Sequence, residues 1–367
     1  MWVVLLIVGL ILFIGLVVVH EFGHFIAARR NGVEVEEFGI GFPPQAWKRK
    51  TKHGFIFSLN WLPIGGFVRL KGENDAATSK GSFGAASFWV KTKIMLAGVL
   101  MNLIVAFVLL TILSLVGMPK VLDDQFVIKS DSTVIRNDVL VGYVDPGSPA
   151  EKAGLQTRDH LLAVTVEGKT QHIRSASQLP AITKPNAGKT IQVHYERDGK
   201  EYAQTVKLRS QKEVKGQAYL GLLPTEFTLT RSTWSSPIVA LGLIKQFTVA
   251  TFEGLGTALS ALFRGDTAKA SEQVSGPVGI VAVLKEGSLL GYQFILFIIA
   301  VISLSLAIMN VLPIPALDGG RFYVMLLSRL FGKRLSQDME ERIVGTSFVF
   351  LLLLIVLITI VDVKRIF

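Results

Sequence analysis

Residues 2–24 read WVVLLIVGLILFIGLVVVHEFGH, an apolar run to Val19 followed at once by His20-Glu21-Phe22-Gly23-His24. At 1.5 Å per residue, a helix over the run is about 27 Å long, close to the roughly 30 Å hydrocarbon core of a bilayer. On a helix, histidines four residues apart lie on one face and can bind one metal ion. The stretch therefore predicts a metal site within the inner half of a membrane.

Glu21 lies between the two histidines in the sequence and has a separate candidate role. It projects roughly 100° around the helix axis from His20, close enough to hold a metal-bound water without being a ligand. The alternative is a chance match to a short motif at the end of a membrane helix. Ionisable residues inside a bilayer are costly and indicate function by default, which favours the first interpretation.

Composition places the chain among membrane proteins and limits which side chains can bind a metal. Half of its residues are hydrophobic, and it contains no cysteine, so a metal must be held by histidine and carboxylate. The net charge of +10 does not indicate nucleic acid as a partner. The basic residues cluster beside apolar segments, as the positive-inside rule expects, and no nucleic-acid-binding motif interrupts them.

The alternation of apolar and polar blocks predicts four transmembrane helices. The first apolar run has no basic segment before it and no cleavage site after it, so we expect it to be retained, with its N-terminus outside the cell. The predicted helices lie in residues 1–28, 94–117, 292–320 and 343–367. Cytoplasmic loops are expected at 29–93 and 321–342, and a polar extracytoplasmic segment at 118–236.

Two segments leave alternatives open. Residues 237–263 are apolar but carry Lys245 and Glu253, so in the segment 237–291 we expect an amphipathic helix on the outer surface rather than a fifth span. Residues 53–70 contain two β-like runs around a Pro/Gly turn. The many large apolar residues in these runs favour a hairpin that dips into the membrane near the site over a fully soluble hairpin. A free strand edge there could pair with an extended substrate. Gly65 and Gly66 are candidate substrate contacts there.

The second predicted span carries Gly98-x-x-x-Asn102. Asn102 is interpreted first as a polar contact between helices and second as a supporting, substrate-binding residue of the site. Asp318, in Asn310-Val-Leu-Pro-Ile-Pro-Ala-Leu-Asp318-Gly-Gly, is the best candidate for a third metal ligand, because a buried carboxylate needs a cation. The alternative is an ion pair between Asp318 and Arg321.

The polar segment contains residues 139–164, which read VLVGYVDPGSPAEKAGLQTRDHLLAV and resemble a bacterial PDZ domain. The resemblance implies peptide binding by strand addition, with Val141, Gly142 and Tyr143 in the lip. Thr157-Arg158-Asp159 departs from the family, which has a glycine before the aspartate.

The chain resembles the site-2 protease family of intramembrane zinc metalloproteases in four features. These are HEFGH in a first span, a PDZ domain between the second and third spans, SGPVGI before the third span and NVLPIPALDGG after it. The resemblance implies one Zn²⁺ per chain on His20, His24 and Asp318, with Glu21 and Asn310 catalytic. It implies single-span membrane substrates, such as anti-sigma factors or signal-peptide remnants, with the PDZ domain as a substrate filter. It also implies a bacterial inner membrane with the site near the cytoplasmic face. Better-known proteobacterial members carry two PDZ domains, whereas this chain has room for one.

The expected fold class is a polytopic α-helical membrane protein with four transmembrane helices, a membrane-associated β-hairpin in the first cytoplasmic loop and one inserted extracytoplasmic α+β PDZ domain. A non-catalytic PDZ scaffold or a metal transporter is the alternative function. Because the histidines end the first span on the cytoplasmic side, Asp318 can join them only if residues 237–263 do not cross the membrane.

Overall fold

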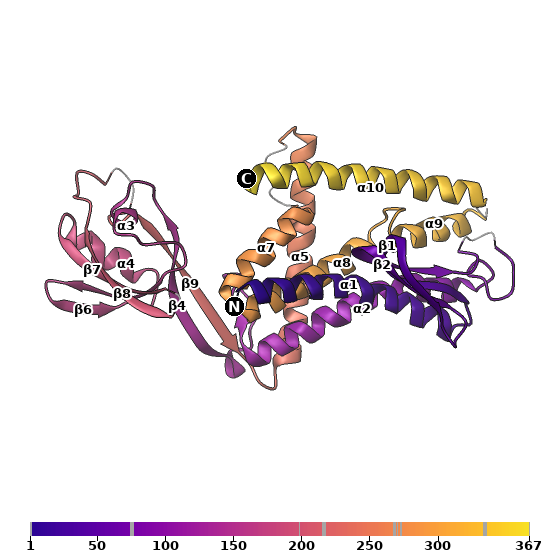
Figure 1. Ribbon diagram of the computed structural model, residues 1–367, viewed down its shortest axis with the longest axis horizontal. Coiled ribbons are helices and arrows are strands. Elements are labelled where there is room, and N and C mark those ends of the chain that lie inside the picture. The colour runs from indigo at the N-terminus through magenta and orange to yellow at the C-terminus, as the bar shows by residue number, and fades with distance from the viewer. Residues whose placement is uncertain are drawn as a thin grey trace. The chain divides into compact units, whose positions relative to one another are not determined.

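The computed structural model describes residues 2–73, 77–197, 199–214, 218–266, 269, 271, 274–332 and 336–366 (Figure 1). Its chain divides into two units. One unit comprises Met1–Ser114 and Ser235–Phe367 and holds the HEFGH motif, and the other is Leu115–Trp234. The first is mostly helical, and the second is a β domain.

Long apolar helices dominate the helical unit. Their bounds are α1 Trp2–Arg30, α2 Phe88–Val116, α5 Ser236–Phe263, α7 Pro277–Leu290, α8 Tyr292–Val311, α9 Asp318–Leu330 and α10 Gln337–Ile366. Among the described residues α1, α2, α5, α8 and α10 are long and apolar enough to cross a membrane. The four segments predicted to span are therefore all helical, and α5 also qualifies by length and composition.

Helix α5 differs from the other long helices. It is the least hydropathic of the five candidates. Within the helical unit, Figure 1 shows it running across the direction shared by α1, α2 and α10. The expectation that residues 237–263 form a helix on the outer surface stays a prediction, because α5 is also long and apolar enough to span.

Two boundaries differ from the sequence expectation for identifiable reasons. Helix α2 begins six residues before Ile94, because Ser87 caps it: the Val90 N–H donates to Ser87 Oγ and the Lys91 N–H to the Ser87 carbonyl. The predicted loop 321–342 contains most of α9, which begins directly at Asp318.

The helical unit has a buried core between α1, α7 and α8, formed by Leu16, Leu284, Ile295 and Ile299. Helix α10 is attached to this core through α7. The Asp362 carboxylate of α10, 1% exposed, accepts hydrogen bonds of 2.8 Å from the N–H groups of Gly276 and Gly279 in the first turn of α7. The SGPVGI motif thus supplies the free N–H groups that a buried carboxylate in an apolar helix requires.

The β domain is a single antiparallel sheet with two short helices. Its strands are β3 Met118–Pro119, β4 Thr133–Val144, β5 His160–Val166, β6 Lys169–His172, β7 Thr190–Arg197, β8 Lys200–Lys207 and β9 Leu222–Arg231. They follow the order β3-β9-β4-β5-β7-β8, with β6 beside β5. The helices are α3 Pro149–Lys152 and α4 Gln178–Thr183, and 3₁₀ turns occupy Lys129–Asp131 and Lys184–Asn186. The buried core of this domain includes Val139, Val164 and Val193.

The Pro-Gly-Ser-Pro stretch of this domain, residues 146–149, leads into a capped helix. Ser148 caps α3 by accepting from the Glu151 N–H, and the Glu151 carboxylate accepts from the N–H of Gly147, the residue before the cap. Arg158 has a φ of +76°. It occupies the left-handed conformation that the usual glycine adopts without strain, at a cost of about 1–2 kcal/mol.

A second, smaller sheet follows α1 in the helical unit, and its pairing differs from the prediction. Its strands are β1 Val35–Lys50 and β2 Ile56–Leu70. The predicted hairpin within 53–70 is wrong, because its two runs do not pair with each other. Residues 35–40 lie between them, pairing with 66–70 on one side and 56–59 on the other, while residues 45–50 pair with 56–60.

Large apolar side chains on this sheet remain exposed. Trp61 is 71% exposed, and Phe42, Trp47 and Leu62 are each close to half exposed. A contiguous apolar surface of this kind is unfavourable in water and indicates a membrane contact. The sheet packs on the end of α1 that carries the histidines, through Phe25, Phe38 and Phe55.

We expect the exposed apolar face of the sheet to contact lipid. The chain has no native cysteine, so single-cysteine variants report one position each. In membranes, Trp61→Cys and Leu62→Cys should react slowly with a bulky, membrane-impermeant maleimide. Lys52→Cys, in the exposed turn between the strands, should react quickly once the reagent has access to its side. Equal labelling rates at all three positions would contradict a membrane contact.

Candidate metal centre

Helix α1 positions two imidazoles in a buried space. His20 and His24 lie one turn apart, are 8% and 9% exposed, and have their Nε2 atoms 3.2 Å apart. A run of hydrophobic residues continues the helix through both positions. The i, i+4 spacing predicted this shared face, and the structure shows it.

Asp318 meets both imidazoles although nearly 300 residues separate it from them. Its Oδ2 lies 3.0 Å from His20 Nε2 and 3.1 Å from His24 Nε2. One carboxylate oxygen of Asp318 thus faces both imidazoles, as a shared metal ligand would.

The three donors fit a zinc ion. Two ligands bound at 2.0–2.1 Å to a tetrahedral ion lie about 3.3 Å apart, close to the three separations above. His20, His24 and Asp318 are a group of metal-binding type whose ligand atoms all lie within 4.8 Å of one another. Two nitrogens and one oxygen with a fourth position free match catalytic rather than structural zinc sites.

Neighbouring groups orient both rings. His24 Nδ1 lies 2.7 Å from the Ile94 carbonyl and donates to it, which leaves Nε2 unprotonated toward Asp318. The Asn102 amide lies 3.2 Å from His20 Nδ1. Metal binding through His20 Nε2 places the proton on Nδ1, so the amide oxygen is the partner that ring needs.

Asn102 is buried behind His20, as a residue that orients a metal ligand would be. It is fully buried, and among the described residues its Oδ1 has no hydrogen-bond partner, which turning the amide toward His20 Nδ1 would supply. Its backbone carbonyl accepts from Ser303 Oγ of α8. The structure therefore places Asn102 both as a contact between helices and behind His20.

Three glycines permit the close approach of the ligand-bearing segments. A Cβ at Gly98 of α2 would lie 2.5 Å from His24 Nε2 and 2.7 Å from His20 Nε2. A Cβ at Gly319 or Gly320 would collide with the carbonyls of Val311 or Ile314. The backbone can approach this closely only without side chains.

Glu21 borders a cavity of about 220 Å³ beside the ligands. Its lining includes His24, Asp318, Phe67, Glu73 and Arg321. Arg321 pairs with Glu73, Nη1 to Oε1 at 2.7 Å, and not with Asp318, so the alternative ion pair considered for Asp318 is absent from the described residues. The Glu73–Arg321 pair was not found from the sequence, since residues 248 apart in a chain give no local signal of contact.

The remaining predicted residues are placed as follows. A Cβ at Gly66 would lie 3.4 Å from Glu21 Cγ, so this glycine is beside the site, and one at Gly65 would meet the Phe42 ring. The Asn310 amide donates to the Leu306 carbonyl in its own helix, and Asn310 does not line the cavity beside Glu21.

The predicted peptide-binding lip lies in the other unit, on β4. Val141 is fully buried, and its N–H and C=O bond to the Asp159 carbonyl and the Arg158 N–H. Gly142 and Tyr143 are on the same strand, which lies between β9 and β5. Both backbone groups of Val141 are therefore already paired, whereas β5 pairs with β4 only at Leu140, so peptide binding at Gly142 and Tyr143 stays a prediction.

Comparisons with known proteins agree over nearly the whole chain. A family model described as peptidase family M50 matches residues 8–354. The chain is similar to a provisionally named zinc metalloprotease of Fusobacterium nucleatum, 31% identical over 98% of this chain and 97% of that protein. It is also similar to zinc metalloprotease RasP of Shouchella clausii, 27% identical over 96% and 97%. Regulator of sigma-W protease RasP of Bacillus subtilis is 26% identical over the full length of both chains.

The contact between Gly98 and the imidazoles gives a direct test of the ligand set. Gly98→Ala should displace both rings and lower the zinc content of the purified protein, measured by mass spectrometry of the metal, by more than about tenfold. Gly15→Ala in α1, where a Cβ meets nothing within 4 Å, is the matched control and should retain full zinc. Equal zinc in both variants would exclude this ligand set.

Proposed function

The chain belongs to peptidase family M50, the site-2 protease family of zinc metalloproteases, and on this premise we propose that it hydrolyses peptide bonds within the membrane. The observation that carries the proposal is the convergence of His20, His24 and Asp318 at one end of apolar helices, with Glu21 facing the adjoining cavity. These helices are long enough to cross a bilayer.

We assign the zinc to His20, His24 and Asp318. When bound there, zinc supplies Lewis-acid activation of water and of the scissile carbonyl. The chain's own residues hold the geometry: the Ile94 carbonyl orients His24, Asn102 orients His20, and Gly98 allows both rings to lie against α2. Asn102 is a positioning residue in this assignment rather than a substrate contact.

Glu21 is the proposed general base and acid. It accepts a proton from the attacking water and delivers it to the departing amine, so the two halves of the reaction use one carboxylate. Its place beside the cavity, next to Gly66 and close to Asp318, suits this role. Asn310 is the proposed partner of the substrate backbone, and its side chain must leave the Leu306 carbonyl to serve it.

The substrate must be unwound before it is cut, because a helical peptide bond is enclosed by its own turn. Residues 66–70 of β2 pair with β1 on one side only, and Phe67, Val68 and Leu70 line the cavity. An extended substrate segment adding to this edge would run past Glu21. Because one relative is named regulator of sigma-W protease, we propose single-span membrane proteins such as anti-sigma factors or signal-peptide remnants as substrates.

Glu21→Gln tests the mechanism in the purified, detergent-solubilised protein with a single-span substrate. Cleavage should fall about 10²- to 10⁴-fold, the usual contribution of a general base, while zinc content stays unchanged. Glu36→Gln, an exposed carboxylate of β1, is the control and should cleave normally. Retained cleavage in Glu21→Gln would overturn the mechanism and reopen the scaffold and transporter alternatives, which need no carboxylate at this position.

We further propose four spans: α1, α2, α8 and α10. Since His20 and Asp318 meet, α1 and α8 end on the same side of the membrane, and α2 returns between them. The segment from α5 to α7 therefore begins and ends on one side. This parity, together with the course of α5 across the other helices, supports a position of α5 along the membrane surface. By the positive-inside rule the metal centre is near the cytoplasmic face of a bacterial inner membrane.

Single cysteines at the two ends of α5 test this topology. Trp234→Cys and Gly265→Cys should both react with an impermeant maleimide added outside intact spheroplasts, because both ends of a surface helix face one side. Lys52→Cys should react only after the membrane is permeabilised. Labelling of Trp234→Cys without Gly265→Cys would mean that α5 crosses the bilayer.

The β domain is the proposed PDZ substrate filter, extracytoplasmic in this topology. Its sheet, its capped α3 and the turn around Arg158 support a PDZ domain. One edge that a peptide could pair with is the side of β9 that faces β3. Residues 222–231 pair with β4 throughout, whereas β3 covers only Leu229 and Thr230.

Removing the domain tests the filter. Pro119 and Leu229 face each other across the β3–β9 ladder, so a short Gly/Ser linker can replace residues 120–228. We expect substrates with bulky outer portions to be cleaved faster, while a substrate with a short outer tail is cleaved at an unchanged rate. Unchanged selection, or loss of cleavage of the short substrate, would count against a filter.

A further inference from the structure

The cavity beside Glu21 has a charged wall that the proposed chemistry does not use. Arg321 and Glu73 form this wall, and both line the space that His24 and Asp318 also line. The two residues are joined twice: Arg321 Nη1 lies 2.7 Å from Glu73 Oε1, and Nη2 donates to the Glu73 backbone carbonyl at 2.8 Å. Because the guanidinium is a rigid planar fork, these two contacts fix the backbone at Glu73 as well as its side chain.

The pair joins the two segments whose separation matters for hydrolysis. Arg321 lies in the first turn of α9, three residues after Asp318, the third candidate ligand. Glu73 lies three residues after Leu70, where β2 ends. The edge of β2 over residues 66–70, which is the proposed place of substrate addition, is therefore tied through the pair to the helix that begins with Asp318.

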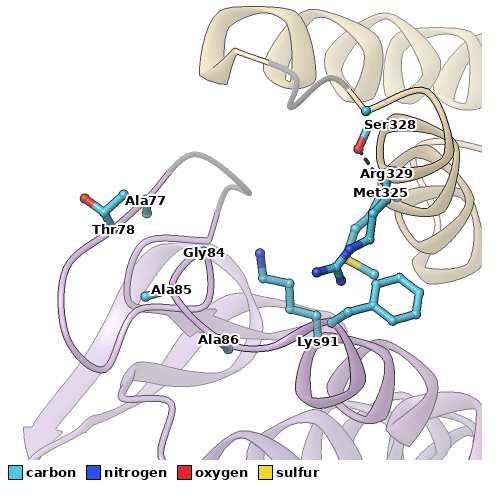
Figure 2. A pocket seen from close by; sticks show the side chains of 11 residues that line it. Ala77, Thr78, Gly84, Ala85, Ala86, Lys91, Met325, Ser328 and Arg329 are labelled. Atoms are coloured by element: carbon cyan, nitrogen blue, oxygen red, sulfur yellow. Dashed lines mark hydrogen bonds between the residues drawn. The ribbon is translucent and has the colours of Figure 1, made fainter.

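The rest of α9 is held against α2. Met325 is buried with residues of α2 in one core cluster. In the last turn of α9, Arg329 Cζ lies 4.9 Å from the centre of the Phe88 ring, at the start of α2. Figure 2 shows Met325 and Arg329 directed from α9 toward the start of α2. Helix α9 is thus fixed at its far end, and at its first turn the ion pair described above connects it to the end of β2.

The ion pair itself adds little to folding stability. The Arg321 and Glu73 side chains are 27% and 38% exposed, and solvent weakens a pair with that exposure. Hydrolysis is far more sensitive to position, since a displacement of about 1 Å can lower a rate about 100-fold. A change to this pair therefore separates the two effects, because it should alter cleavage strongly and unfolding only slightly.

We propose that Arg321 and Glu73 are positioning residues, which set the distance between the substrate-accepting edge of β2 and the metal centre. This role rests on the proposed hydrolysis and explains how a bound strand is aligned with the site. Neither residue touches the reacting atoms. When the pair is broken, a substrate segment still adds to residues 66–70, but it lies at the wrong distance from Glu21 and Asp318.

Kinetics of Arg321→Met and Glu73→Ala in the detergent-solubilised protein, with a single-span substrate, test this role. Each variant should lower kcat about 10- to 100-fold while KM changes less than about twofold, because binding to the strand edge is retained and alignment is lost. The double variant should lose no more than either single one, because the two residues act as a unit. Arg321→Lys, which keeps a cation without the fork, should recover part of the rate.

Lys71→Met is the matched control. Lys71 Nζ pairs with Glu34 Oε2 at 2.9 Å, its side chain is 35% exposed, and it lies two residues before Glu73 without lining the cavity. This variant should keep the wild-type kcat. Hydrogen–deuterium exchange adds a readout that needs neither substrate nor metal: amides of the segment 66–73 should exchange faster in Arg321→Met than in Lys71→Met.

Three results would overturn the proposal. The first is a kcat for Arg321→Met and Glu73→Ala equal to that of Lys71→Met, and the second is equal amide exchange in all three variants. The third is a fall in zinc content or melting temperature large enough to account for the lost rate, which would make the pair structural. Failure of the proposed hydrolysis would look different, because the wild-type protein would then cleave nothing or Glu21→Gln would cleave normally.

Discussion

The structure depends on one constraint: two imidazoles and a carboxylate at the end of apolar helices must satisfy each other. An ionised carboxylate left alone in such a place costs many times the free energy that holds a domain together. In the proposed zinc site Asp318 shares a cation with His20 and His24, whose Nε2 atoms lie 3.0–3.1 Å from its Oδ2. Gly98, Gly319 and Gly320 follow from the same requirement, because any side chain there would separate the three groups.

Helix α9 links the metal centre to the surface of the helical unit. Its first residue is Asp318, and Arg321 in its first turn pairs with Glu73 at the cavity wall. Its last turn brings the Arg329 guanidinium over the Phe88 ring at the start of α2, with Cζ 4.9 Å from the ring centre. One short helix therefore joins the metal centre to α2.

The parts of the site that rest on local spacing could be predicted. His20 and His24 share a face because four residues make about one turn, and Glu21 follows from its neighbours. Asp318 was found because a carboxylate at the end of a span needs a cation. Asn102 was assigned only half of its role, since the Gly98-x-x-x-Asn102 pattern describes helix contact and not which imidazole it contacts. The hairpin within 53–70 was misassigned, because a strand run does not reveal its partner.

From the residues alone we predict the zinc chemistry, the helical stretches, a candidate donor set and the requirement that both halves of the site end on one side. Each depends on residue type and on short-range periodicity, which the chain carries locally. Three features appear only in the folded chain: β1 lies between the two runs of β2, Arg321 pairs with Glu73, and Arg329 lies over the Phe88 ring. These contacts join residues far apart in the chain, and the packing that selects them is a property of the folded whole.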